Sequence, residues 1–299
     1  MLFKKLIAFK LTEKIGLTAR GLECVLQSIQ FTPCTSHQYS STGFYPPVES
    51  TGFMVHEAGG NLMFCVKHEE KLLPTTAVNE LVKKKVDEAE SEGHKLTRKG
   101  HNAVKDEVIF GLLPNALAKS SLTYGYIDAK QEFIFIEASS YNKAEEVLSL
   151  LRKTLGSLPC VPLNVKNNVV QSLTRWMSDV DQTDEALKFG LDHYCELRGE
   201  DSVIKCKNID LLLPEVQHHI QDGKLCYKLG LYVLDRISFV ISDDLSIKRI
   251  KFLGIVQDKI MEQEPDSAEH AFTVEMLIMC DELGAMMNDL IAAFGGLED

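Results

Sequence analysis

The sequence lacks the short motifs that mark common nucleotide-binding and catalytic loops. It contains no GxxxxGK[ST] phosphate loop, no GxGxxG turn, no GxSxG nucleophile turn and no HExxH zinc helix. None of its eight cysteines forms a CxxC pair, which is typical of reduced thiols in a cytosolic protein rather than of a zinc site or a disulfide framework. We therefore expect no catalytic residue, no metal site and no cofactor.

Long apolar runs are also missing. No stretch reaches the roughly 20 apolar residues that a membrane-spanning helix needs. The first residues, MLFKKLIAFKL, interleave lysines with apolar residues, which predicts a strand and not a signal peptide. The chain has 299 residues, 45% hydrophobic and 25% charged, so we expect a cytoplasmic protein with a sizeable core and no membrane contact.

Positive charge is scarce overall but unevenly distributed. The net charge is -11, which by itself argues against a nucleic-acid partner. From Gln257 to the end, however, eleven acidic residues stand against Lys259 alone, and the rest of the chain carries only -1. Because salt screens charge over roughly 8–10 Å, a basic surface can coexist with an acidic segment that points elsewhere.

Hydrophobic periodicity predicts an α+β fold of antiparallel sheets with helices. Residues 1–74 and 118–162 pattern as strands and helices of one discontinuous domain, interrupted by a helical insert at 75–117. The connector Leu158–Pro162 marks a boundary, and residues 163–299 form a second domain. That second part has predicted strands at 202–207, 224–233, 236–242 and 246–253, a helix from Pro214 that stops at Gly223, and a long helix over 267–294.

Basic residues gather in two regions. Lys95, Arg98 and Lys99 precede an apolar helix pattern that ends at Pro114, with Lys105 on the same segment. In the second domain, strand alternation places three pairs of bases each on a common face: Lys205 with Lys207, Lys224 with Lys228, and Arg249 with Lys251. Such faces fit a polyanion that is bound through its phosphates, while a solvated lysine-rich sheet face is the alternative.

Other candidate sites are weaker. His218 and His219 are adjacent on a predicted helix and point apart, which does not suit a shared metal. Asp243 and Asp244 suit a turn between two strands. A metal-dependent nuclease using Asp106, Glu107 or Asp243 stays an alternative, as does a protein-interaction module acting through the acidic C-terminal segment.

Several stretches resemble the RdgC family of recombination-associated proteins, in order and across essentially the full length. They are Phe31–Cys34 (FTPC), Gly43–Pro47 (GFYPP), Glu69–Pro74 (EEKLLP), Lys105–Val108 (KDEV) with Leu112–Pro114 (LLP), Leu150–Pro159 (LLRKTLGSLP) with Val161–Pro162, and Asp243–Phe252 (DDLSIKRIKF). The sequence departs from the family at Ser120–Ser121, where relatives often carry an aromatic residue.

The resemblance implies a ring-shaped homodimer that encircles double-stranded DNA without sequence preference and limits the access of the RecA recombinase. It implies a central domain, a helical tip (75–117) and a base domain (163–299), and a nucleoid-associated protein that is not an enzyme. The residues that it would direct toward the DNA are Lys95, Arg98, Lys99, Lys105, Lys119, Lys205, Lys207, Lys224, Lys228, Lys248, Arg249 and Lys251.

Overall fold

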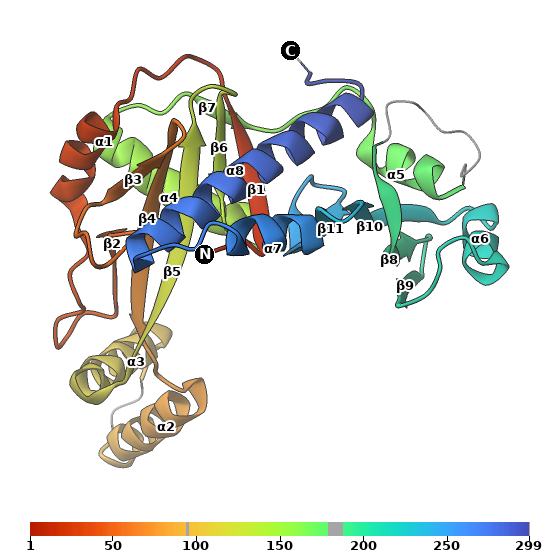
Figure 1. Ribbon diagram of the computed structural model, residues 1–299. Coiled ribbons are helices and arrows are strands. Elements are labelled where there is room, and N and C mark those ends of the chain that lie inside the picture. The colour runs from red at the N-terminus through yellow and green to blue at the C-terminus, as the bar shows by residue number, and fades with distance from the viewer. Residues whose placement is uncertain (94–95, 179–187, 299) are drawn as a thin grey trace.

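The computed structural model describes residues 1–93, 96–178 and 188–298. Its described part is an α+β fold built on a large antiparallel sheet, with eight α-helices (Figure 1). The strand order is β2-β4-β5-β6-β1-β12-β11-β10-β8-β9, with β3 paired to β4 and β7 to β1. The predicted fold class is therefore confirmed in its α+β, antiparallel character.

The first half of the sheet contains the strands before residue 163. They are β1 (Lys5–Leu11), β2 (Ser40–Tyr45), β3 (Val55–Ala58), β4 (Asn61–Lys71), β5 (Ala118–Asp128), β6 (Phe133–Ile136) and β7 (Cys160–Pro162). Helices α1 (Ala19–Leu26) and α4 (Tyr141–Leu155) pack on one face, where Leu22, Leu148 and Leu151 are buried against Ile7 and Phe9. Thr18 caps α1 and Ser140 caps α4 through their hydroxyl oxygens, as the local sequence allows.

The second half continues the same sheet. Its strands are β8 (Gly190–Arg198), β9 (Val203–Lys207), β10 (Leu225–Val233), β11 (Ile237–Ser242) and β12 (Ile247–Phe252). The two halves join at β1, which pairs with β6 on one side and with β12 on the other; Leu6 lies opposite Ile247. Residues on both sides of position 162 therefore belong to one sheet.

Four helices cover the other face of the sheet. They are α5 (Val169–Ser178), α6 (Pro214–Gln221), α7 (Gly254–Met261) and α8 (Ala268–Ala293). The long α8 crosses both halves (Figure 1) and buries Met276, Met279 and Leu283 against Phe3, Leu229 and other apolar side chains. Arg236 donates two hydrogen bonds of 2.9 Å to the buried carboxylate of Glu282 and so ties α8 to the turn after β10.

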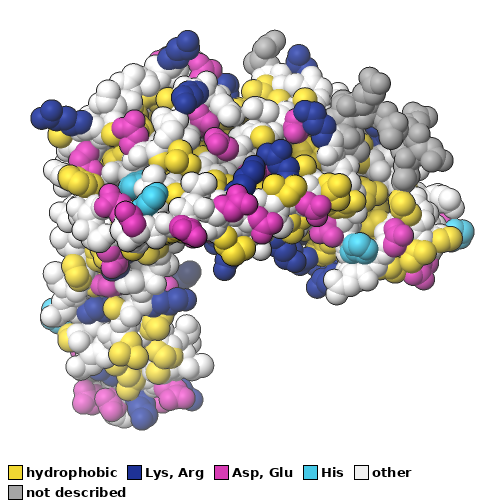
Figure 2. Space-filling view, in the orientation of Figure 1, with side chains coloured by type: hydrophobic (Ala, Val, Ile, Leu, Met, Phe, Trp, Pro, Cys, Tyr) yellow, Lys and Arg dark blue, Asp and Glu magenta, His cyan; other side chains and the backbone are white. Residues whose placement is uncertain are grey.

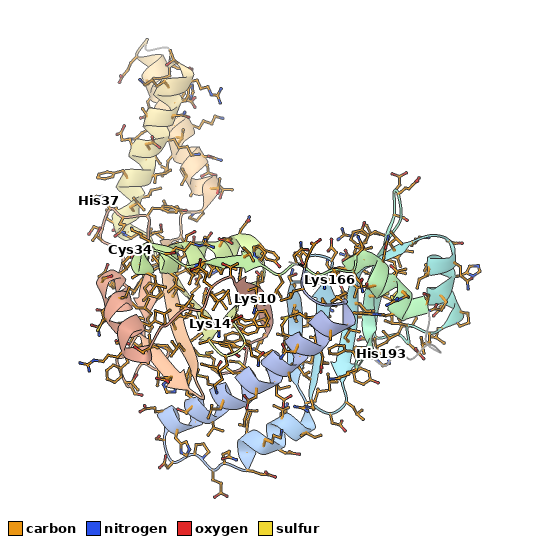
Figure 3. All side chains as sticks on the ribbon, turned by 90° about the horizontal axis from the view of Figure 1, so that it is seen from above. Lys10, Lys14, Cys34, His37, Lys166 and His193 are labelled. Carbon is orange, nitrogen blue, oxygen red and sulfur yellow. The ribbon has the colours of Figure 1, made fainter. Side chains whose placement is uncertain are left out.

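A helical hairpin interrupts the sheet between β4 and β5. It consists of α2 (Thr75–Ser91) and α3 (Arg98–Leu112), followed by a short 3-10 turn, Leu113–Asn115. The hairpin projects from one end of the sheet, away from β8 and β9 at the other end, which gives the molecule an L-shaped outline (Figure 1 and Figure 3). Among the described residues, no helix is long and apolar enough to span a membrane.

Three strands were not predicted: β2, β8, and β7, which lies in the segment expected to be a connector. The small polar residues Ser40–Thr42 hide the alternation of β2. Strand β8 was also missed, although Cys195 and Leu197 alternate with charged residues along it. The polar stretch from Ser178 to Glu185, whose sequence suits a loop or a helix start, lies outside the described residues except for Ser178.

Candidate nucleic-acid interface

One face of the second half of the sheet carries most of the predicted basic residues. In the described part of the chain no helix covers this face, because α5 to α8 all pack on the opposite one. We call it the basic sheet face and define it by Lys5, Arg198, Lys205, Lys207, Lys228, Lys248, Arg249 and Lys251. The strand pairings place them together: Lys205 and Lys228 both lie opposite Glu196, and Lys248 lies opposite Lys5.

A buried carboxylate organises the middle of this face. Glu196, only 2% exposed, accepts hydrogen bonds from Lys228 (2.9 Å) and Arg198 (2.7 Å) and lies 3.5 Å from the Lys205 ammonium. Burial alone would raise the pKa of Glu196, but these three cations outweigh it and hold the pKa at about 2. Glu196 therefore stays ionised and cancels part of the charge of the cations around it.

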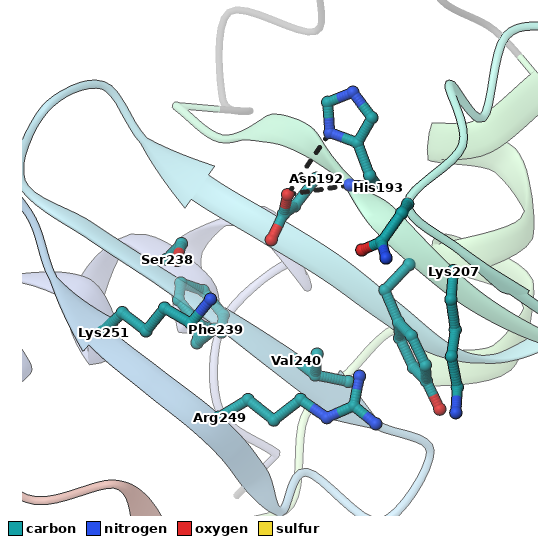
Figure 4. A pocket seen from close by; sticks show the side chains of 10 residues that line it. Asp192, His193, Lys207, Ser238, Phe239, Val240, Arg249 and Lys251 are labelled. Carbon is teal, nitrogen blue, oxygen red and sulfur yellow. Dashed lines mark hydrogen bonds and ion pairs between the residues drawn. The ribbon is translucent and has the colours of Figure 1, made fainter.

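Three further basic residues, from β9 and β12, surround a pocket of about 180 Å³ (Figure 4). Lys207, Arg249 and Lys251 line it together with Tyr194 and Asp192. The Arg249 guanidinium stacks on the ring of Tyr194, 4.2 Å from its centroid. Three of the predicted residues, from two strands far apart in the sequence, thus meet at one concave site.

The pairing of Lys224 with Lys228 on one face is wrong. The register of β10 against β8 shifts between Cys226 and Lys228, so an extra residue breaks the alternation there. Cys226 and Leu229 both point into the core, Leu225 is exposed, and Lys228 lies on the basic sheet face. Lys224 precedes the strand on the covered side, with its ammonium 3.9 Å from Asp222.

The helical hairpin supplies a second set of cations. Arg98, Lys99 and Lys105 on α3 are exposed, as is Lys119 at the start of β5, and in the described part of the chain none of the four forms an ion pair. Thr97 begins α3 by accepting a hydrogen bond from the Gly100 backbone. Lys95 lies outside the described residues.

Lys71 fixes the hairpin to the sheet. It is only 7% exposed, and its ammonium donates to the carbonyl oxygens of Ser36 (2.6 Å) and Leu113 (2.7 Å). Because this buried ammonium donates to a carbonyl at the end of the hairpin (Leu113) and to one in the loop beside β4 (Ser36), it ties the two segments together. Lys71 therefore sets the direction in which the hairpin projects.

The acidic segment lies on the other side of the molecule. Residues 257–298 include α8, which packs on the covered face of the sheet. Figure 2 shows acidic side chains across the front of the molecule, and Lys and Arg side chains along the lower edge of the arm and on the side of the hairpin that faces the hollow. The basic sheet face and the acidic segment therefore point in different directions, as a polyanion-binding role requires in a chain of net negative charge.

Comparison with known proteins identifies the family. A family model described as "Putative exonuclease, RdgC" matches residues 1–297. Curated proteins named recombination-associated protein RdgC from Yersinia pestis, Yersinia pseudotuberculosis and Edwardsiella ictaluri are 36% identical over 299 residues, covering 98% of this chain and 98% of each relative. The chain belongs to the RdgC family. The resemblance found in the sequence is thereby confirmed.

The RdgC family description contains the word exonuclease, and a metal-dependent nuclease needs a cluster of metal ligands. Within the described residues, no group of three or more His, Cys, Asp or Glu side chains is arranged to hold a metal ion. Asp106 and Glu107 are exposed on α3, where Glu107 pairs with Lys85 at 2.6 Å. Asp243 and Asp244 form the turn between β11 and β12, as predicted, and Asp244 accepts a hydrogen bond from the Ser246 backbone.

Sequence reasoning missed four residues of the basic sheet face in this RdgC chain. Tyr194, Glu196 and Arg198 lie on β8, which was not predicted, although its alternating pattern could have revealed that strand. Lys5 joins the face through the pairing of β1 with β12, a contact between residues more than 240 positions apart. No local pattern announces such a pairing.

Proposed function

We propose that this protein binds double-stranded DNA without reading its sequence, through the basic sheet face and the cations of the hairpin. The observation that carries the proposal is that Lys and Arg side chains gather along the lower edge of the arm and on the hollow-facing side of the hairpin, while the acidic segment packs on the covered face of the sheet. Lysine and arginine on exposed surfaces neutralise phosphates and carry no base readout unless they enter a groove. A DNA-binding role also suits the recombination-associated name of the relatives.

Salt dependence tests the proposal. Dissociation constants measured by fluorescence anisotropy should be nearly equal for duplexes of unrelated sequence. The logarithm of the association constant K should fall linearly with the logarithm of the salt concentration, with a slope of roughly -0.9 per phosphate neutralised. Replacing both Arg98 and Lys99 by alanine should weaken binding to every duplex and flatten the slope. The matched control replaces Lys188 and Lys259, which pair with Asp289 and Glu282 on the acidic side. An equal loss in both double variants would refute the placement.

A second copy of the chain would close the hollow. We propose that two L-shaped chains form a ring-shaped homodimer around the duplex, as the family resemblance implies. Exposed apolar side chains near the hairpin's root, Phe110, Leu117 and Leu122, suit a protein contact there. Light scattering should give twice the 33.5 kDa chain mass, and a monomer at micromolar concentration would contradict the ring.

The proposed consequence is occlusion. A DNA-bound ring in the nucleoid would compete sterically with RecA filament growth and so limit recombination and the processing of replication forks. The Arg98 and Lys99 double variant should then lose inhibition of RecA-promoted strand exchange in proportion to its loss of DNA binding. Inhibition by a variant that no longer binds DNA would instead support direct contact with the recombinase through the acidic surface.

The family description favours a second candidate, exonuclease activity. Its cheapest test is incubation of end-labelled duplex with the purified protein and magnesium or manganese. Cleavage that disappears in Asp106→Asn or Asp243→Asn would support a nuclease. Intact DNA at protein concentrations that saturate binding would leave the non-enzymatic proposal in place.

A further inference from the structure

The pocket on the basic sheet face depends on an unusual backbone at Arg249. Its φ is +54°, a left-handed conformation that glycine adopts freely and other residues rarely do. Among the described residues six non-glycine positions have positive φ, and Arg249 is the one inside a strand. The register of β11 against β12 shifts there, between Ser238 and Val240, so Arg249 occupies a β-bulge, which re-aims its side chain.

The re-aimed guanidinium is held in place by an aromatic ring. Arg249 stacks on Tyr194 at 4.2 Å, and Tyr194 lies directly opposite Lys207 in the pairing of β8 with β9. The ring therefore lies beside both cations. In Figure 4 the charged ends of Arg249 and Lys207 extend to the same side. Within the described residues neither Arg249 nor Lys207 forms an ion pair, unlike Lys205 on the same strand.

Apart from Phe239 and Val240, the rest of the pocket lining is polar. Lys251 and Ser238 lie opposite one another on β12 and β11, and Asn208, also left-handed at φ +55°, directly follows β9. Asp192 is the one acidic residue among those lining the pocket, and its carboxylate accepts a hydrogen bond from the His193 backbone (2.8 Å) and lies 3.5 Å from the His193 ring. Three cations against one carboxylate leave the pocket positively charged.

We propose that this pocket is a discrete subsite for one phosphate group, with Arg249 and Lys207 donating hydrogen bonds to its oxygens and Lys251 adding charge from the other wall. The inference rests on the proposed DNA-binding function and goes beyond it, because diffuse surface charge needs no fixed site. A stacked guanidinium is pre-organised for paired hydrogen bonds to phosphate oxygens. The backbone strain at Arg249 is of the kind that accumulates at functional sites.

Inorganic phosphate is the probe that separates a built site from diffuse charge. Binding to the full chain is measured by phosphorus NMR line broadening at constant ionic strength, with chloride as the reference anion. Lys207→Met should weaken phosphate binding by about tenfold, the loss of one charge-assisted hydrogen bond. The matched control is Lys205→Met on the same strand and face, outside the pocket, which should change it by less than about twofold.

Equal effects of the two lysine substitutions, or no phosphate binding by the wild-type chain, would overturn the pocket. Arg249→Lys keeps the charge and should still lose affinity, because lysine lacks the planar fork. Wild-type affinity in that variant would also contradict the assignment. The failures are separable: DNA binding without phosphate binding sinks the pocket alone, and phosphate binding without DNA binding sinks the proposed function.

Three duplexes of one sequence distinguish the source of the phosphate. They are a linear duplex with 5′-phosphates, the same duplex with 5′-hydroxyls, and a covalently closed dumbbell without ends. Equal affinities, each reduced more by Lys207→Met than by Lys205→Met, assign the pocket to an internal phosphodiester. If the duplex with 5′-phosphates binds more tightly than the other two, and Lys207→Met abolishes that difference, the pocket holds a terminal phosphate. If both lysine variants weaken all three duplexes equally, the subsite is refuted for DNA.

Discussion

Replacing Glu196 by glutamine should lower stability and raise DNA affinity together. Glu196 is buried among Lys228, Arg198 and Lys205, which depress its pKa from 4.5 to about 2. At roughly 1.4 kcal/mol per pKa unit, that difference corresponds to roughly 3 kcal/mol of unfolding free energy. The glutamine variant loses this contribution but frees three cations of the basic sheet face.

The affinity gain is smaller. One uncompensated charge at roughly 8 Å from a phosphate, in an effective dielectric of about 40–80, is worth about 0.5–1 kcal/mol, or roughly a two- to fivefold tighter Kd. The slope of log K against log salt should steepen by up to about 0.9 per chain. Anisotropy titrations at several salt concentrations measure both. Weaker DNA binding by the folded variant would refute the reasoning and mean that Glu196 positions the cations.

The pH dependence of stability checks the same network. A carboxylate with a depressed pKa stabilises the fold fully above its ordinary value, near 4.5, and loses this contribution as pH falls toward 2. In urea unfolding, the difference of roughly 3 kcal/mol between wild type and Glu196→Gln should therefore hold at pH 7, shrink below about pH 4.5 and vanish near pH 2. A difference independent of pH would show that packing, and not charge, is responsible.

Three further substitutions probe the fold around the interface. Arg249→Gly relieves a left-handed conformation that costs about 1–2 kcal/mol. The melting temperature of this variant should therefore stay level or rise while its DNA affinity falls. A fall in both the melting temperature and the DNA affinity would show that Arg249 is structural. Lys71→Met should speed hydrogen exchange in α3 but not in β4, and unchanged exchange in α3 would remove Lys71 as the anchor. Arg236→Ala leaves the buried Glu282 carboxylate with Lys259 at 3.7 Å, so urea unfolding should show a loss of about 3 kcal/mol with DNA affinity unchanged.

The sequence predicted the elements whose patterns are local. Alternation placed Arg249 and Lys251 on one face, and both line the pocket on the basic sheet face; the turn at Asp243 is where the local residues put it. The helical insert was predicted because its apolar positions recur with helical spacing. These features depend on neighbours in the chain, so the sequence carries them directly.

The site itself depends on contacts between distant strands. The shift in β10 that separates Lys224 from Lys228 arises from its pairing with β8, and no residue type in 224–228 signals it. Glu196 looks like any strand carboxylate until β8, β9 and β10 bring three cations around it. Charge counting therefore found the right strands but overestimated the free positive charge on them.

Lysine footprinting with and without duplex DNA tests the central claim most directly. Reductive methylation followed by mass spectrometry reports the accessibility of each lysine in the intact protein. The proposed interface predicts that DNA protects Lys99 and Lys105 on the hairpin and Lys207, Lys248 and Lys251 on the sheet, while Lys188 and Lys259 on the acidic side react as before. Protection of Lys188 and Lys259, with the five interface lysines unchanged, would contradict it.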